Sequence, residues 1–433
     1  MSLKFDNHPQ RVALASEAHA RPFMVIDAPT QVSHIAVFCD DQLELHAHLL
    51  ADLCRHFGVA APESQAKHFS HDFGSFRLRW ENHSEFSSYY FIAAEAVAEP
   101  FTLTPLRFVP DAWLAGLNSY VMAAAHVSLS KDWGHASAPQ QVAQYFAGSV
   151  IVGSRVTNGG EVWTDFQIQP DGFSRFLIFD VDLREKQAGR LIQRVLEIDT
   201  YRMMAMLAFP RAWELSSALR DIETELAQLT QALIAGDEKK EQDLLRQLLE
   251  LSSRLEALAV ANNFHFSATE AYDKIIQTRI SELREMRIEG VPTIGEFMQR
   301  RLLPAMDTCR SVRQRMETLA QRIGRTNDLL RTRIGITQEQ QNRAILESMN
   351  RRAELQLRLQ QAVEGLSVAA ISYYLIGLAN YALKGLKAAG IGLNVELSTG
   401  LLIPVLLAGV WWGIRRLRQV IRHGTPETRP KDG

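Results

Sequence analysis

The sequence lacks the motifs that mark most catalytic and metal-binding sites. Its three cysteines, Cys39, Cys54 and Cys309, are far apart and have no CxxC spacing, which argues against a disulfide framework and against a thiolate zinc site. The chain contains no Walker A loop, Rossmann glycine fingerprint, nucleophile elbow or HExxH motif. We therefore predict no catalytic residues, no metal and no cofactor. The odd, scattered cysteines favour a reducing compartment.

A charge excess of either sign is also missing. Lys and Arg total 47 and Asp and Glu total 49, so the formal net charge is only −2. A strongly basic chain is the usual signature of a protein that binds nucleic acid, and we therefore expect no nucleic acid partner. The first twelve residues are polar and lack the apolar core of a secretory signal, so we predict no export signal there.

Long apolar runs are absent before residue 365 and occur twice after it. The two runs are Gly365 to Leu383 and Leu397 to Ile414. A helix needs about 20 mostly apolar residues to cross the hydrocarbon core of a bilayer, so each run is just long enough. We predict a two-helix transmembrane hairpin over 365–414, followed by a basic tail over 415–433.

Basic residues near the two runs predict the orientation of the hairpin. Cytoplasmic flanks of membrane spans are enriched in Lys and Arg. The connection between the runs holds only Lys384 and Lys387, whereas seven arginines flank the hairpin on its outer sides. We therefore predict that both termini are cytoplasmic. The flanking arginines are Arg351, Arg352, Arg358, Arg415, Arg416, Arg418 and Arg422.

Residues 1–182 alternate short β-rich segments with helical ones. This alternation predicts a cytoplasmic α/β domain with a mixed sheet and leaves the strand order open. The predicted helices are 42–56 and 139–146. The predicted strands are 33–39, 75–80, 86–93, 119–128, 149–156, 161–167 and 174–179.

Residues 183–364 read as helical. A helix is predicted from Leu183 to Phe209, ended by Pro210. Two leucine-rich stretches with coiled-coil spacing follow around a break at 235–237, which predicts an antiparallel hairpin within 183–290. A single long coiled-coil helix with a stutter is the alternative. The first stretch carries Leu215, Leu219, Ile222, Leu226, Leu229 and Leu233, and the second carries Leu244, Leu248, Leu251, Leu255 and Leu258.

A stalk helix is predicted over 291–364. Thr293 and Glu296 have the spacing of a capping box, which places the start of this helix near Ile294. Its weak points are Pro304, Gly324 and Gly335. If the helix continued unbroken through the first apolar run it would have about 90 residues and a length of roughly 135 Å.

The first apolar run carries polar and small residues on one helical face. Because polar groups inside a bilayer usually face a bundle interior or a water path, four of these residues are pore-lining candidates. The alternative is that they only pack and hydrogen-bond between helices. A ring of lysines at the outer mouth would oppose cations unless each lysine paired with Glu396. The candidates are Tyr373, Gly377, Asn380 and Lys384.

Nine arginines lie between residues 300 and 333, against three acidic residues. Arginine favours bidentate contact with carboxylate or phosphate, so Arg313, Arg322 and Arg325 are candidates for binding an anionic ligand or an acidic subunit face. The alternative is a solvated helix surface whose arginines pair with acidic residues of the 214–225 segment.

Two further groups of polar residues lie in the N-terminal part. His19 and Arg21 precede Pro22 in a segment that either presents them to an anionic ligand or partner or ties down the N-terminal arm. On a strand from Arg79 to Phe86, the side chains of Glu81, His83 and Glu85 would share one face, and Arg79 is a further candidate beside them. A metal site and an enzyme site are alternatives for this second group, and ordinary surface hydrogen bonding is the simpler interpretation.

The order of elements is similar to that of CorA-type divalent-cation channels. In that family the stalk and first span oligomerise and the first spans line a pore. The Gly-Met-Asn signature that follows the first span in the family is absent here, where the chain reads Ala379-Asn380-Tyr381-Ala382-Leu383-Lys384-Gly385. The resemblance therefore implies the architecture and argues against magnesium selectivity.

A second resemblance covers nearly the whole chain. Three segments, 17–22, 79–86 and 363–374, resemble an uncharacterised bacterial family described as predicted membrane-anchored proteins. That resemblance implies a bacterial inner-membrane location and no particular reaction.

Together these patterns lead to one main hypothesis, a CorA-like homo-oligomeric ion-transport or channel protein of altered selectivity. The alternative is a membrane-tethered scaffold or sensor whose cytoplasmic part binds a protein or an anionic ligand.

Overall fold

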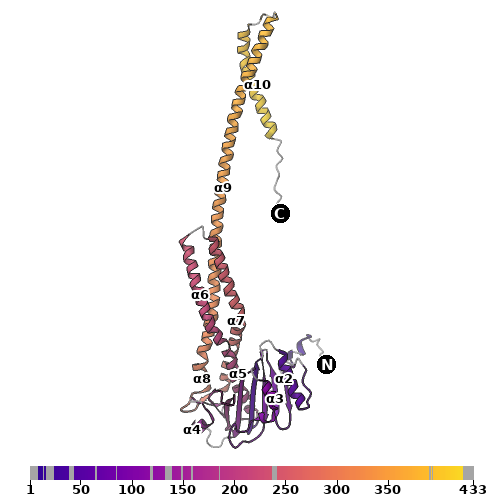
Figure 1. The fold of residues 1–433 in the computed structure, drawn as a ribbon, viewed down its shortest axis with the longest axis vertical. Helices are drawn as coiled ribbons and strands as arrows, with labels where there is room; N and C mark the ends of the chain where they lie inside the picture. The colour runs from indigo at the N-terminus through magenta and orange to yellow at the C-terminus, as the bar shows by residue number, and fades with distance from the viewer. Residues whose placement is uncertain are drawn as a thin grey trace, which may run out of the picture. The chain divides into compact units, whose positions relative to one another are not determined.

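The computed structural model forms two compact units, Met1–Leu329 and Leu330–Gly433 (Figure 1). The residues that it describes are 8–12, 14–15, 24–38, 43–63, 66–83, 85–117, 120–131, 139–147, 150–157, 159–184, 186–236, 241–389, 392 and 394–422. Cys39, His19 and Arg21 lie outside these residues.

The first unit is built around one mixed sheet. Its described strands lie in the order β2-β3-β4-β1-β5-β8-β7-β6-β9, and β5 and β8 are the one parallel pair among them. The prediction of a mixed sheet is confirmed. The strands are β1 Thr30–Phe38, β2 His68–Asp72, β3 Arg77–Asn82, β4 Phe86–Ala93, β5 Val121–Lys131, β6 Val152–Val156, β7 Gly160–Thr164, β8 Ser174–Asp180 and β9 Met286–Arg287.

One face of the sheet is covered by short helices. Leu50, Leu53 and Trp113 from two of these helices pack on the β1 and β4 side chains of this face. Farther along the same face, Val142 packs on Trp163 and Leu177. The short helices are α2 Leu43–His56, η1 Pro105–Phe108, α3 Asp111–Gly116, α4 Pro139–Val142 and η2 Ala143–Tyr145.

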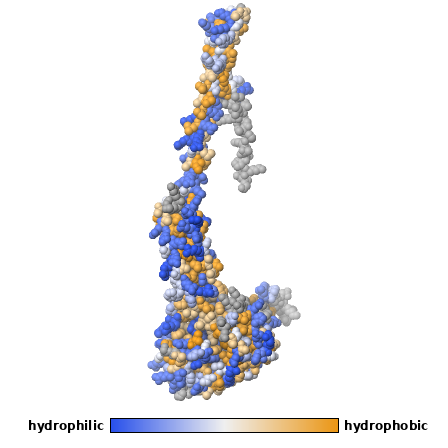
Figure 2. Space-filling model, viewed as in Figure 1, coloured by the Kyte–Doolittle hydropathy of each residue, from blue (hydrophilic) through white to orange (hydrophobic). Residues whose placement is uncertain are grey.

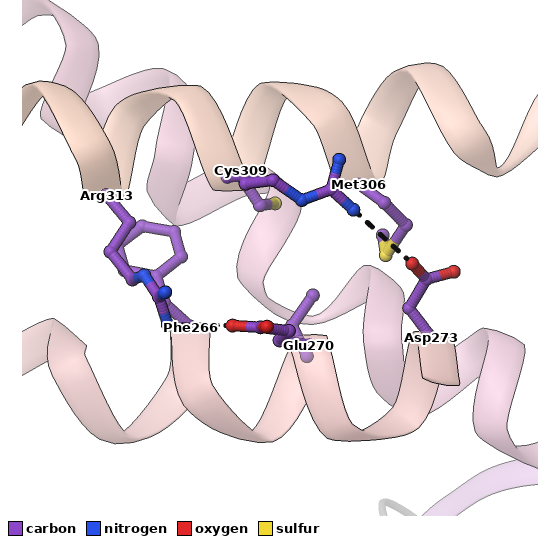
Figure 3. A pocket seen from close by; sticks show the side chains of 8 residues that line it. Phe266, Glu270, Asp273, Met306, Cys309 and Arg313 are labelled. Atoms are coloured by element: carbon purple, nitrogen blue, oxygen red, sulfur yellow. Dashed lines mark ion pairs between the residues drawn. The ribbon is translucent and has the colours of Figure 1, made fainter. Parts of the chain in front are cut away.

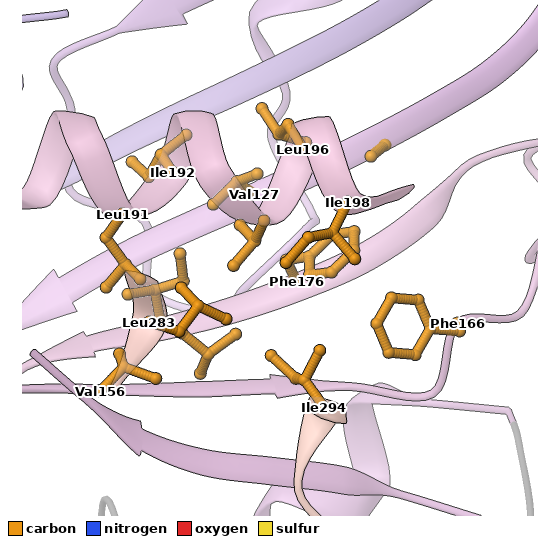
Figure 4. Packing of buried hydrophobic residues seen from close by; sticks show 14 of the residues in the cluster. Val127, Val156, Phe166, Phe176, Leu191, Ile192, Leu196, Ile198, Leu283 and Ile294 are labelled. Carbon is orange, nitrogen blue, oxygen red and sulfur yellow. The ribbon is translucent and has the colours of Figure 1, made fainter. Parts of the chain in front are cut away.

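The other face holds the largest buried cluster. Helix α5, Gln187–Met206, lies on β5 and packs against α7, Glu241–Leu283. Side chains of α5 meet Val127 and Phe176 of the sheet, and Leu283 and Ile294 reach the same core from two other elements (Figure 4). Because successive strand residues point to opposite faces, each central strand contributes apolar side chains to both cores.

Helices α6, Ala208–Ala235, and α7 pack against each other and run in opposite directions (Figure 1). The first five apolar residues predicted on the α6 seam are buried, as are the first four on α7. The prediction of two helices is therefore confirmed, and the single-helix alternative is wrong. Pro210 does not end a helix, because it lies in the first turn of α6, where the missing N–H has no helical acceptor.

The capping box at Thr293 is confirmed. The Glu296 backbone N–H donates to Thr293 Oγ1 at 3.1 Å, and the Thr293 N–H donates to Glu296 Oε2 at 3.1 Å. The helix that starts there, α8 Ile294–Arg301, is short, and α9 runs separately from Leu303 to Ala388. The break precedes Pro304, whose ring clashes with the carbonyl of the preceding turn. Gly324 and Gly335 do not interrupt α9.

The second unit contains the last part of α9 and helix α10, Val395–Arg422. Both helices are long and apolar enough to cross a membrane, by length and composition. Pro404 lies inside α10 without ending it. Apolar side chains gather on the surface of these helices (Figure 2), and Leu366 and Leu401 expose 75% and 71% of their area. The two apolar runs therefore fold as two helices, as the sequence predicts.

Candidate functional site

Arg79 and Glu81 form a buried ion pair on β3. The Arg79 Nε atom lies 3.1 Å from Glu81 Oε1, and Arg79 Nη2 lies 2.5 Å from the same oxygen. Both residues are less than 10% exposed. They are two residues apart on a strand, so their side chains leave the same face, while Leu78 and Trp80 enter the core beneath the other face.

His83 and Glu85 lie close to this pair, although not on a strand. Strand β3 ends at Asn82 and β4 begins at Phe86, so the single strand from Arg79 to Phe86 on which the shared face depended does not form, and the separate strands predicted over 75–80 and 86–93 correspond to β3 and β4. Because β3 and β4 pair antiparallel, the chain makes a turn between Asn82 and Phe86. His83 Nε2 is 3.9 Å from Glu81 Oε2, and the Tyr272 hydroxyl of α7 donates to Glu85. The turn thus brings all four predicted residues into one region.

Two residues that the sequence pattern did not single out complete this polar cluster. Tyr90 on β4 lies directly opposite both Arg79 and His34, so the three side chains form a row across β3, β4 and β1. The His34 and Tyr90 rings have centroids 4.6 Å apart. Cross-strand neighbours on one face interact strongly, and this row connects the ion pair to the centre of the sheet.

Burial keeps both rings of this row uncharged at neutral pH. Burial, with a smaller contribution from the nearby His83, lowers the pKa of His34 to about 3. Burial raises the pKa of Tyr90 well above its usual value, and the charges of Glu81 and Glu197 add to that effect. Among the described residues, His34 Nε2 has no hydrogen-bond partner. The cluster therefore holds one ion pair beside neutral aromatic groups.

An ion-pair chain between α5 and α7 lies beside this cluster. Arg279 of α7 donates to Glu197 of α5 and also to Glu282 Oε2 at 3.0 Å. Arg194 Nε of α5 lies 3.0 Å from the same Glu282 oxygen. These contacts fix α5 against α7 above the sheet. Within the described part of the chain, no group of three His, Cys, Asp or Glu side chains has the geometry to hold a metal ion.

The arginine-rich part of α9 is extensively paired with acidic residues. Arg313 Nη1 lies 2.9 Å from Glu270 of α7 (Figure 3), and Arg315 Nε donates to Glu223 of α6 at 2.7 Å. The Glu223 pairing matches the interpretation that these arginines contact the 214–225 segment. Arg322 and Arg325 are exposed, and Arg325 Nε donates to a backbone carbonyl in its own helix.

The four pore-lining candidates lie on α9 inside the second unit. Tyr373 exposes 76% of its area, Lys384 is exposed, and Gly377 and Asn380 are half-buried. Ser372, which the sequence did not single out, is 3% exposed. In the described residues, Lys384 and Glu396 form no ion pair. The candidate face is therefore mostly exposed at its two ends and partly covered in the middle.

Comparison with known protein families identifies the chain. A family model described as "Protein of unknown function (DUF3422)" matches residues 6–421. The chain belongs to the DUF3422 family. No curated protein matches it. The expectation of a family without an assigned function is confirmed for the DUF3422 protein, and the family description contains no statement about membrane anchoring or CorA-type channels.

Proposed function

We propose that the DUF3422 protein is a membrane-anchored homo-oligomer in which the first spans of several copies surround an ion path. The observation that carries this proposal is one continuous face of α9. Leu355, Leu359, Leu366 and Tyr373 are spaced 4, 7 and 7 residues apart, and Asn380 follows seven residues later. Residues with this spacing lie on one seam of a helix that packs against other helices.

The leucines of this face are exposed to an unusual degree. Leu355, Leu359 and Leu366 expose 61%, 68% and 75% of their area. Burying one such side chain contributes about 1.5–3 kcal/mol, so a row of them favours association. A second copy is the partner that fits best, because the row continues in register into the first span. The same contact would then gather the first spans around one axis.

The composition of this face inside the span supports a path for ions. Tyr373, Gly377, Asn380 and Lys384 would surround the axis of such an assembly. Polar side chains inside a bilayer are expensive to leave in lipid and are usually directed at a bundle interior. Lys384 lies one helical turn beyond Asn380, and a ring of ammonium groups repels cations. We propose that this path favours anions and excludes divalent cations, unlike the CorA-type channels with similar element order.

The distribution of charge around the two helices supports the orientation within this proposal. Arginines flank the outer sides of the two apolar runs, and the connection holds only Lys384 and Lys387. By the positive-inside rule both ends of the chain would be cytoplasmic, in the inner membrane of a bacterium. The sheet-containing unit would then also be cytoplasmic.

The association is tested by light scattering of the full-length protein in detergent, coupled to size exclusion. We expect a closed ring, and we expect Leu359→Glu to reduce the mass to that of smaller species. The matched control is Leu357→Glu, because Leu357 is equally exposed at 60% but lies on a different face of α9. A wild-type monomer or dimer would refute the ring and favour a membrane-tethered scaffold.

The ion path is tested by flux in liposomes that contain the purified protein. We expect chloride flux to exceed magnesium flux and Asn380→Leu to abolish most of it. Lys384→Ala should raise cation flux relative to anion flux. Leu378→Ala is the control, because Leu378 is 67% exposed and lies away from this face. Absence of any flux, or an unchanged flux in Asn380→Leu, would refute the ion path. Neither result would affect the conclusion about oligomerisation, which rests on light scattering.

A further inference from the structure

A hollow with a volume of about 390 Å³ lies where four parts of the first unit meet. These parts are the end of β6, the connection between β8 and α5, the first turns of α5, and the end of α7. The described residues that line the hollow are polar or charged, and none of them is aromatic. They are Thr157, Asp182, Arg184, Gln187, Arg190, Arg194, Glu282 and Arg284.

The charge of this arginine-lined pocket is positive. Its described lining residues include four arginines and two acidic residues, which gives a formal balance of +2 for this set. Glu282 is already shared by Arg194 and Arg279, so its charge is compensated. Arg184 and Arg284 are exposed, and within the described part of the chain neither forms an ion pair. Two guanidinium groups are therefore available to a ligand.

Backbone contacts hold the walls of the pocket together. The Thr157 N–H donates to the Leu283 carbonyl at 3.0 Å, which joins the end of β6 to the end of α7. The N–H groups of Val181 and Asp182 donate to the Gly159 carbonyl at 2.9 and 2.8 Å. A Cβ atom on Gly159 would lie 2.2 Å from the Asp182 carbonyl oxygen, so only glycine permits this approach. The arginines thus project from a backbone that is already in place.

The N-terminus of α5 adds to the positive potential. Helix α5 has 20 residues, and its N-cap, Lys186, makes no side-chain capping hydrogen bond. The Gln187 side chain instead accepts from the Arg184 N–H at 2.8 Å. The first turn of a helix carries a partial positive charge, which attracts anions. Helix and arginines therefore favour the same kind of ligand.

We infer that this pocket binds a small phosphate-bearing anion. Arginine forks match phosphate oxygens bidentately, and two uncompensated guanidinium groups suit a ligand with more than one negative charge. The absence of aromatic lining argues against a stacked base, which limits the ligand to the phosphate and a small polar group. Bound there, the anion links the sheet to the ends of α5 and α7. This inference is independent of the proposed ion path.

The test is isothermal titration calorimetry of the full-length protein in detergent with inorganic pyrophosphate as the probe. We expect saturable binding that weakens with added salt. The double variant Arg184→Gln/Arg284→Gln should weaken binding by at least about tenfold, because it removes charge-assisted hydrogen bonds. The control is Arg211→Gln, which removes an exposed arginine outside the pocket.

A second variant tests the pocket independently if the double variant does not fold. Gln187→Glu preserves the side-chain oxygen that accepts from the Arg184 N–H but adds a negative charge to the pocket. It should weaken pyrophosphate binding without lowering the melting temperature. Absence of binding to the wild type, or equal binding by both pocket variants and the wild type, would overturn the inference. Tighter binding of citrate than of pyrophosphate would overturn the assignment to phosphate.

A competition experiment distinguishes the two sources of such a group. Phosphatidic acid in mixed micelles is added to the pyrophosphate complex, with phosphatidylcholine as the control lipid. Displacement by phosphatidic acid alone would support a lipid headgroup as the ligand. Persistence of the complex would support a soluble phosphate compound. Either result retains the pocket as a phosphate site.

Discussion

Because two histidines are buried in the folded protein, we predict that its free energy of unfolding falls steeply in mild acid. His34 and His126 are 1% and 5% exposed. Burial lowers the pKa of His34 to about 3 and that of His126 to about 4. His126 Nδ1 lies 2.9 Å from Ser33 Oγ, and its ring stacks on Phe173 with centroids 4.0 Å apart. Each ring therefore binds a proton readily in the unfolded chain but only weakly in the folded protein.

The sign and size of the effect follow from these values. The unfolded pKa is 6.5 for both rings, so between that value and the folded pKa the unfolded state binds more protons. Stability contributed by each neutral ring is complete above pH 6.5 and decreases as the pH falls. At pH 5 each histidine lowers the free energy of unfolding by about 2 kcal/mol relative to pH 8, and together they lower it by about 4 kcal/mol. Typical domains have only about 5–15 kcal/mol of total stability.

The assay is urea unfolding of the full-length protein in detergent, followed by tryptophan fluorescence, at several values between pH 5 and pH 8. The double variant His34→Gln/His126→Gln removes both titrating groups and should flatten the pH dependence, although its stability at pH 8 is lower. His56→Gln, which changes an exposed histidine, is the control. The same slope in the double variant and the wild type would refute the reasoning.

Four further predictions concern packing, helix propensity, charge and thiol reactivity. Gly189→Ala should lower stability by about 1–3 kcal/mol in urea unfolding, because its Cβ would lie 1.8 Å from a backbone carbonyl oxygen. Gly324→Ala, with nothing within 4 Å, should instead stabilise α9 by about 0.5–1 kcal/mol, and a loss would contradict this explanation. The Arg315 side chain lowers the pKa of Glu223 below its ordinary value of 4.5, and a double-mutant cycle should give a coupling of about 0.2–1 kcal/mol at pH 7 that is lost only as the pH falls through that lowered pKa. Burial raises the pKa of Cys309 to about 11, so its thiol should react with a disulfide reagent only as fast as the protein unfolds; rapid labelling would show that α9 opens locally.

Local patterns predicted those elements that depend on residues close in the chain. The capping box at Thr293 and the separation of α6 from α7 rest on signals within a few turns of helix. Strand β2 was missed because it is a short edge strand with a single apolar residue, Phe69, so the alternation of its exposed and half-buried positions does not appear as an apolar pattern in the sequence. Pro304 was one of three predicted weak points of the stalk helix, and the break between α8 and α9 lies just before it.

The candidate site shows where sequence patterns stop being sufficient. Arg79, Glu81, His83 and Glu85 could be grouped from the sequence, because they lie within seven residues of one another. The row formed with Tyr90 and His34 was not readable, because it requires β4 to lie between β3 and β1 in a particular register. That register is set by the packing of both sheet faces at once.

The sequence by itself determined the mixed α/β class, the helical second half, the two apolar helices and the absence of common catalytic motifs. Each of these follows from composition or from periodicity within one segment. Only the tertiary structure decided which charged groups meet. The pocket near Arg184 and Arg284 joins segments more than 100 residues apart. Those segments are held together by the shared hydrophobic core, because apolar burial is non-directional and single-segment patterns do not specify which elements it brings together.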